Sequence, residues 1–94
     1  MRDFKGKTAV ITGAASGIGF ALAEKFASEG MNIVLADIEQ HALDIAVSEI
    51  SKLGVRTHGV IVDVMDKDAV NHLFDESVKT FKNIHILCNN AGVA

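Results

Sequence analysis

Short runs of apolar and β-branched residues alternate along this chain with longer stretches in which apolar residues recur at helical spacing. The short runs have the composition of strands and begin about every 25 residues. The four predicted strands are Thr8–Thr12, Asn32–Asp37, Gly59–Asp63 (expected to begin a few residues earlier) and Ile84–Asn89. This alternation is typical of βαβ units and predicts an α/β fold built on a parallel sheet.

Three amphipathic helices are expected between these strands. Gly30 and Gly54 are placed to end the first two helices, and Asp66 is a suitable N-cap for the third. The predicted apolar faces are Ile18, Leu22 and Phe26, widened by Ala21 and Ala27; Leu43, Val47, Ile50 and Leu53; and Val70, Leu73, Phe74, Val78 and Phe81. No linker or low-complexity segment interrupts the pattern, so residues 1–94 are expected to form one domain.

The chirality of parallel crossovers limits how these elements assemble. Right-handed crossovers put the first two helices on one face of the sheet. In a doubly wound, Rossmann-type sheet of strand order 3-2-1-4, the third helix crosses to the other face and a crevice opens between the first and fourth strands. Ligands bind at the carboxyl ends of such strands, so the loops after Thr12 and Asn89 are the first candidates for a site.

Composition excludes several classes of protein. With 49% hydrophobic and 22% charged residues the chain is too apolar for a disordered segment, and 8 glycines are too few for a collagen-like one. A formal net charge of −3 disfavours nucleic acid and anionic membranes as partners. No apolar run approaches a membrane span, the N-terminus lacks the apolar segment of a signal peptide, and Cys88 cannot form an internal disulfide. We therefore expect a cytoplasmic globular protein.

A glycine-rich segment, TGAASGIG from Thr12 to Gly19, joins the first strand to the first helix. Gly13 permits a sharp exit from the strand, while Gly17 and Gly19 let the backbone approach a phosphate. The first amides of the helix would then face a pyrophosphate. No Lys-Ser or Lys-Thr follows the glycines, so the segment is not a Walker A loop and NTP hydrolysis is not expected. Three glycines in a simple tight loop are the alternative interpretation.

Asp37, at the end of the second strand, predicts the choice of cofactor. An acidic side chain there accepts hydrogen bonds from the ribose 2′- and 3′-hydroxyls and repels a 2′-phosphate. Ser16 and Ile38 supply no positive charge to offset that repulsion. The sequence therefore predicts NAD rather than NADP, with a solvated aspartate at a strand end as the alternative.

The same segments carry a resemblance to a known family. The pattern TGxxxGIG, the pair Asp63-Val64 after the third strand and the motif Asn89-Asn90-Ala91-Gly92 after the fourth resemble the short-chain dehydrogenase/reductase family in its main branch. The resemblance covers nearly the whole chain but only the N-terminal half of a typical member.

The resemblance also implies roles for individual residues. Asp63 would bind the adenine amino group and Val64 would add a backbone contact; the alternative, that Asp63 caps the third helix, suits Asp66 better. Asn90 would lie near the cofactor riboses, and Ala91 and Gly92 would allow close approach. The cofactor-binding residues expected from sequence and resemblance together are Gly13, Ser16, Gly17, Ile18, Gly19, Asp37, Asp63, Val64, Asn90, Ala91 and Gly92. Asn89 is expected to tie neighbouring strand ends together.

Catalytic residues are not expected within these 94 residues. The family uses a Ser, a Tyr-x-x-x-Lys pair and an Asn beyond the Asn-Asn-Ala-Gly motif, and this chain contains no tyrosine. No metal site is expected either, because the four histidines lie in separate predicted elements without ligand spacing.

Three hypotheses about function remain open. The first is the NAD-binding part of a dehydrogenase that transfers hydride between NAD(H) and an alcohol or carbonyl compound. The second is a non-catalytic nucleotide-binding or interaction module that pairs with a full-length relative. The third is the product of a truncated gene or an incomplete piece of a longer chain. In each case the fourth strand would be an exposed edge, so self-association or pairing through that edge is expected.

Overall fold

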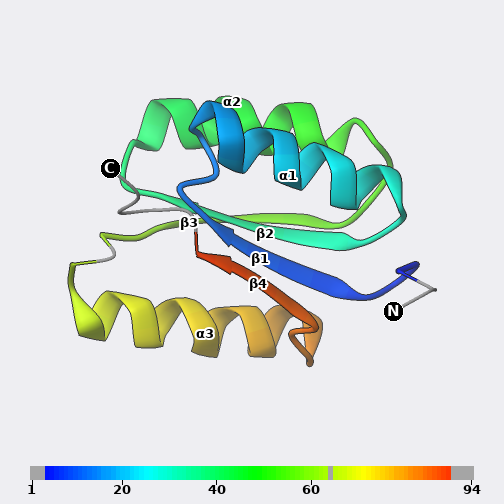
Figure 1. Ribbon diagram of the computed structural model, residues 1–94. Helices are drawn as coiled ribbons and strands as arrows, with labels where there is room; N and C mark the ends of the chain where they lie inside the picture. Colours follow the sequence, from blue (N-terminus) through cyan, green and yellow to red (C-terminus); the bar gives the residue numbers. More distant parts are fainter. Residues whose placement is uncertain (1–3, 64, 90–94) are drawn as a thin grey trace.

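The computed structural model describes residues 4–63 and 65–89 of the chain (Figure 1). Its elements alternate in the predicted order: β1 (Thr8–Thr12), α1 (Gly17–Ser28), β2 (Asn32–Asp37), α2 (Gln40–Ser51), β3 (Thr57–Ile61), α3 (Lys67–Phe81) and β4 (Ile86–Asn89). All strand pairs are parallel and the sheet has the order β3-β2-β1-β4. The predicted Rossmann-type order 3-2-1-4 is therefore confirmed.

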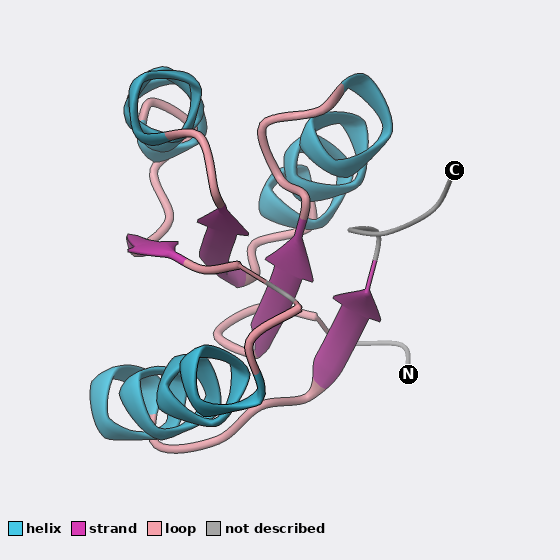
Figure 2. Cartoon of the chain, turned by 90° about the vertical axis from the view of Figure 1, so that its left-hand side faces the viewer, coloured by secondary structure: helices cyan, strands magenta, loops and turns pink. Residues whose placement is uncertain are grey.

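The helices cover the two faces of the sheet unequally. Helices α1 and α2 lie side by side on one face and α3 lies alone on the other (Figure 2). The larger apolar cluster contains the buried residues Ala9, Ile11, Ala14, Ala23, Ala27, Met31, Ile33, Leu35, Leu43, Ala46 and Ile50. The smaller one contains Val10, Val34, Ala36, Val60, Val62 and Leu73. Successive residues of β1 and β2 enter opposite clusters, because side chains alternate between the faces of a sheet.

Helix α1 approaches the sheet through small residues. Its buried positions are Gly19, Ala23 and Ala27, whereas Ile18 is 67% exposed. The predicted apolar face is therefore wrong at Ile18 and at Ala21, which is also exposed, although Leu22 and Phe26 do pack against the larger cluster. Small side chains let a helix lie close to the strands, a constraint that apolar periodicity does not express.

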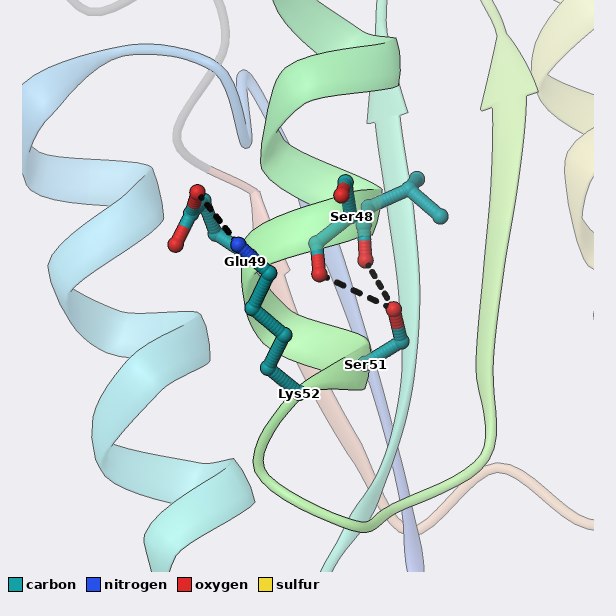
Figure 3. Close-up of polar contacts among 5 residues, drawn as sticks. Ser48, Glu49, Ser51 and Lys52 are labelled. Carbon is teal, nitrogen blue, oxygen red and sulfur yellow. Dashed lines mark hydrogen bonds and ion pairs between the residues drawn. The ribbon is translucent and has the colours of Figure 1, made fainter.

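The C-terminal turn of α2 is closed by local polar contacts (Figure 3). The Ser51 hydroxyl donates to the carbonyls of Val47, at 2.8 Å, and Ser48, at 3.0 Å. Lys52 donates to Glu49 at 3.2 Å. The chain then turns at Gly54, whose φ of +85° lies in the left-handed region that favours glycine. The helix itself ends at Ser51 with Lys52 as its C-cap, so Gly54 lies in the turn that follows the helix. Leu53, which was expected on the apolar face, lies outside the helix and is 46% exposed.

The third and fourth strands differ from their predicted bounds. Strand β3 ends at Ile61, and beyond it the side chain of Asp63 accepts a hydrogen bond from the Met65 amide in a turn. Strand β4 begins at Ile86 rather than Ile84. Just before it, the Thr8 amide donates to Nδ1 of His85 at 3.1 Å, so an imidazole ring takes the place of a strand carbonyl.

Helix α3 begins as the sequence predicts. The Asp66 side chain accepts from the amides of Asp68 and Ala69, which is the N-cap arrangement. Leu73 is fully buried, but Val78, which was expected on the buried face, is 47% exposed. Ser77 is buried instead, and its hydroxyl donates to the Leu73 carbonyl at 2.7 Å. Among the described residues, no helix combines the length and apolarity needed to cross a bilayer.

Candidate functional site

The glycine-rich loop joins β1 to α1 (Figure 1). The side chain of Ser16 closes this loop. The Ser16 hydroxyl donates to the Gly13 carbonyl at 2.7 Å and accepts from the Gly19 amide at 3.2 Å. The Ser16 amide donates to the same carbonyl at 3.1 Å. Gly13 has a φ of +64°, which a residue with a side chain would rarely adopt. Ser16 is thus the N-cap of α1, and it links the loop to the start of the helix.

The glycines at 17 and 19 have different surroundings. A Cβ atom on Gly19 would overlap the carbonyl group of Gly13, so this glycine is required for packing within the protein. A Cβ atom on Gly17 would meet no atom within 4 Å. The sequence interpretation assigned both to phosphate approach, but for Gly19 the close contact with Gly13 is sufficient reason.

The start of α1 has the properties of an anion site. Gly17 and Ile18 are exposed, and no hydrogen bond joins either amide to a described residue. Amides at a helix N-terminus carry partial positive charge and favour negatively charged groups. A phosphate group would fit the open space above Gly17, where a side chain would otherwise lie.

Asp37 lies beside this loop at the carboxyl end of β2. Its Oδ2 accepts from the Ala15 amide at 3.0 Å and its Oδ1 accepts from the Glu39 amide at 3.0 Å. A carboxylate oxygen can accept two hydrogen bonds, so both oxygens of Asp37 could also accept from ribose hydroxyls. The fold therefore brings Asp37 and the loop together as the strand order predicts. The bond from Ala15 was not predicted, and no local sequence signal indicates it.

Asp63 lies near the end of the neighbouring strand, at the same edge of the sheet. The amide of Val62 donates to the Asp37 carbonyl at 3.0 Å, and the exposed Asp63 side chain accepts from the Met65 amide at 2.9 Å. Asp63 therefore does not cap α3, whereas Asp66 does. Val64 lies outside the described residues.

The end of β4 is tied to the end of β1. The Thr12 hydroxyl donates to Oδ1 of Asn89 at 2.8 Å, and these two residues are also partners in the strand register. This contact confirms the expectation that Asn89 joins neighbouring strand ends. Asn90, Ala91 and Gly92 lie outside the described residues.

A cavity of about 330 Å³ lies on the α3 face of the sheet, next to the edge strand. Leu87 of β4 lines it and is 47% exposed. The remaining lining residues are Thr12, Lys67, Val70, Asn71, Leu73, Phe74 and Asn89. The described residues of its walls are mainly apolar and include no acid–base pair. They could therefore contact an apolar group but do not form a catalytic site.

The histidines and the cysteine show no metal or nucleophile site. No group of three His, Cys, Asp or Glu side chains is arranged for a metal ion within residues 4–63 and 65–89. Nε2 of His58 and Oε2 of Glu76 lie 3.0 Å apart and join β3 to α3. Desolvation by burial raises the pKa of the Cys88 thiol, which disfavours the reactive thiolate.

A parallel sheet of this order, with a glycine-rich first turn and an acid at the end of the second strand, defines the class of dinucleotide-binding α/β proteins. Within this class, the family model for short chain dehydrogenases matches residues 7–94. The chain belongs to the short-chain dehydrogenase family.

Similar proteins come from several bacteria. The C alpha-dehydrogenase of a Sphingobium strain is 42% identical over 94 residues, which are 99% of this chain and 31% of that protein. The 1-deoxy-11-beta-hydroxypentalenate dehydrogenase of Streptomyces arenae is 44% identical over 87 residues, covering 93% and 31%. The chain therefore spans about a third of the length of these relatives.

Solved structures of similar fold are also about three times as long as this chain. A short-chain dehydrogenase/reductase from Burkholderia phymatum in complex with NAD has 45% identity and a TM-score of 0.88, covering 93% of this chain and 31% of that one. NAD⁺-bound xylitol dehydrogenase has 37% identity and a TM-score of 0.94, covering 98% and 35%.

Proposed function

We propose that residues 1–94 form the NAD-binding unit of a dehydrogenase that transfers hydride between NAD(H) and an alcohol or carbonyl substrate. The observation that carries this proposal is the meeting of the Asp37 carboxylate with the glycine-rich loop at one edge of the sheet. The two NAD-bound relatives of similar fold support a nicotinamide dinucleotide as the ligand.

The start of α1 would hold the pyrophosphate. The amides of Gly17 and Ile18 donate to no described residue and would donate to phosphate oxygens, with the helix dipole adding to the attraction. Gly13, Ser16 and Gly19 would keep these amides in place, since their mutual hydrogen bonds and close packing define the turn.

Asp37 would bind the ribose of the adenosine and select NAD over NADP. Its charge would repel a 2′-phosphate at short range, and neither Ser16 nor Ile38 carries a compensating charge. One relative, with 40% identity, is an L-rhamnose 1-dehydrogenase (NADP(+)) from Thermoplasma acidophilum. The family model alone therefore does not decide the preference.

The adenine and the nicotinamide half would use the other strand ends. We assign Asp63 and Val64 to the adenine ring, and Asn90, Ala91 and Gly92 to the region of the riboses. The bound nicotinamide would supply the hydride acceptor. Because the 94 residues contain no tyrosine, we expect them to bind the cofactor without turning over an alcohol by the family mechanism.

Calorimetry with NAD and NADP tests the proposal. We expect the chain to bind NAD at least tenfold more tightly than NADP, because a repulsion of about 1.4 kcal/mol between Asp37 and the 2′-phosphate corresponds to a factor of ten in affinity. Asp37→Arg should weaken NAD and tighten NADP, each by about tenfold. Asp75→Arg makes the same charge change on the exposed side of α3 and should leave the ratio unaltered. An Asp37→Arg variant with the wild-type ratio would remove Asp37 from the site.

Within residues 4–63 and 65–89, β4 pairs only with β1, and its other edge supports self-association as a second proposal. Leu87 is 47% exposed on this strand and borders the cavity beneath α3, so an edge with apolar surface is available for pairing. We expect light scattering to give a mass above that of one chain. A monomer at high concentration would contradict this, and NAD binding would be unaffected by that result.

We also infer that the protein works in a reducing compartment, the cytoplasm. Cys88 is the single cysteine of the 94 residues, so they cannot form a disulfide among themselves. Fractionation of the source cells would test this location.

A further inference from the structure

The glycine-rich loop is fastened to the end of β2 at two points. The Ala14 amide donates to the Ala36 carbonyl at 3.1 Å, and the Ala15 amide donates to Oδ2 of Asp37 at 3.0 Å. The first bond joins two backbones and does not depend on residue type. The second bond exists only because position 37 carries a side-chain acceptor.

The Asp37 carboxylate is itself held in position. Its Oδ1 accepts from the Glu39 amide at 3.0 Å, so one amide on each side fixes the orientation of the carboxylate group. The residue is half-buried, and a hydrogen bond from an amide to an ionised carboxylate is stronger than one between neutral groups. These two hydrogen bonds therefore fix the orientation of the side chain and anchor the loop to it.

We propose that Asp37 is a positioning residue for the pyrophosphate loop, in addition to any contact with ribose. This inference rests on the proposed function. Ala15 directly precedes Ser16, whose hydroxyl is bonded to Gly13 and Gly19 at the start of α1. The tether at Ala15 thus fixes the loop from which the amides of Gly17 and Ile18 emerge. Loss of the acceptor at position 37 loosens the loop and weakens phosphate binding.

A nucleotide without ribose hydroxyls separates the two roles of Asp37. 2′,3′-Dideoxyadenosine 5′-diphosphate keeps the adenine and the pyrophosphate but offers Asp37 nothing to bind. If Asp37 contacts only ribose, Asp37→Ala binds this probe as well as wild type or better, because a repelling negative charge is removed. If Asp37 positions the loop, the variant binds it about three- to tenfold more weakly, the range expected for one lost hydrogen bond. The affinity of Asp37→Ala for this probe therefore distinguishes the two roles: it falls only if Asp37 positions the loop.

Calorimetry with this probe on wild type, Asp37→Ala and Asp75→Ala is the decisive comparison. Asp75→Ala removes the same charge from exposed helix α3 and should change the affinity by less than about twofold. Unchanged or tighter binding by Asp37→Ala would overturn the proposal. If wild type binds neither this probe nor NAD, the proposed function fails instead.

Amide hydrogen exchange tests the tether without any nucleotide. In wild type the Ala15 amide should exchange at least tenfold more slowly than those of Gly17 and Ile18, after correction for intrinsic rates. In Asp37→Ala the protection of Ala15 should be lost while that of Ala14 remains, since Ala14 is bonded to backbone. Equal exchange at Ala15 and Gly17 in wild type would refute the tether. Because this comparison uses wild type alone, it tests the tether even if Asp37→Ala does not fold.

Discussion

The two faces of the sheet are packed in different ways. On the α1–α2 face, glycines let backbone and side chains approach closely: Gly19 lies against Gly13, and Gly59 of β3 lies under Val47 of α2. On the α3 face, Leu73 is buried but borders a cavity of about 330 Å³. The glycine-rich loop leads into α1 on the first face, where the close contact between Gly19 and Gly13 holds the turn.

Polar contacts help to fasten α3 where apolar packing is thin. The Arg56 guanidinium lies 4.7 Å from the ring centre of Phe81 and donates to the Thr80 carbonyl at 3.2 Å. His58 and Glu76 add the ion pair between β3 and the same helix. The start of α1 therefore lies on the face where glycines allow close contacts, while α3 on the opposite face is held partly by half-exposed polar groups.

The largest expected difference between the faces is in the cost of truncating a buried leucine. Leu35 and Leu73 are both fully buried, one on each face. We expect Leu35→Ala to lower the free energy of unfolding by about 4 kcal/mol and Leu73→Ala by about 2–3 kcal/mol, because Leu73 already borders empty space. Urea unfolding measures both values. An equal or larger loss at Leu73 would contradict the looser packing inferred for the α3 face.

A pair of glycine substitutions sharpens the comparison at the site itself. A Cβ atom on Gly59 would lie 2.7 Å from Val47 Cγ2, so Gly59→Ala should cost about 1–2 kcal/mol of stability. Gly17→Ala meets nothing within 4 Å and should not destabilise the fold, since alanine favours helix more than glycine by about 1 kcal/mol.

The added methyl group of Gly17→Ala would still occupy the space proposed for phosphate. We expect NAD affinity to fall by about tenfold or more, since one displaced contact of about 1.4 kcal/mol gives that factor. Calorimetry on the folded variant measures it, and an unchanged affinity would place the phosphate elsewhere.

The smallest expected effect concerns the ion pair on the α3 face. The hydrogen bond from His58 lowers the pKa of Glu76 from its ordinary 4.5, with further help from the charges of His58, His72 and Lys79, against desolvation. A lowered carboxyl pKa contributes stability that is complete above pH 4.5 and is lost as the pH falls through the lowered value. Because both partners are about one-third exposed, the contribution should be below about 1 kcal/mol.

Glu76→Gln should remove this part of the acid dependence. Urea unfolding at pH 7 and pH 3 would show a smaller difference for the variant than for wild type. Glu49→Gln, on the exposed side of α2 beside Lys52, is the matched control and should change the dependence less. The same acid dependence in wild type and Glu76→Gln would mean that the pair does not help to hold α3.

Much of the fold could be predicted from local pattern. Strands β1 and β2, the parallel order 3-2-1-4, the cap at Asp66 and the turn at Gly54 all agree with expectation. Each depends on residues close in sequence or on the handedness of crossovers. The glycine-rich loop and Asp37 were found in the same way, because their positions at strand ends follow from the alternation of elements.

The sequence alone determined the class of fold, the family and the placement of the glycine-rich loop, Asp37 and Asp63 at the carboxyl ends of the strands. The tertiary structure decided the buried face of α1, the imidazole of His85 that replaces a strand carbonyl, and the bond from Ala15 to Asp37. The physical reason is distance along the chain. Periodicity reports which side of one element is apolar, whereas close approach and hydrogen bonding depend on atoms that meet only after several elements have packed together.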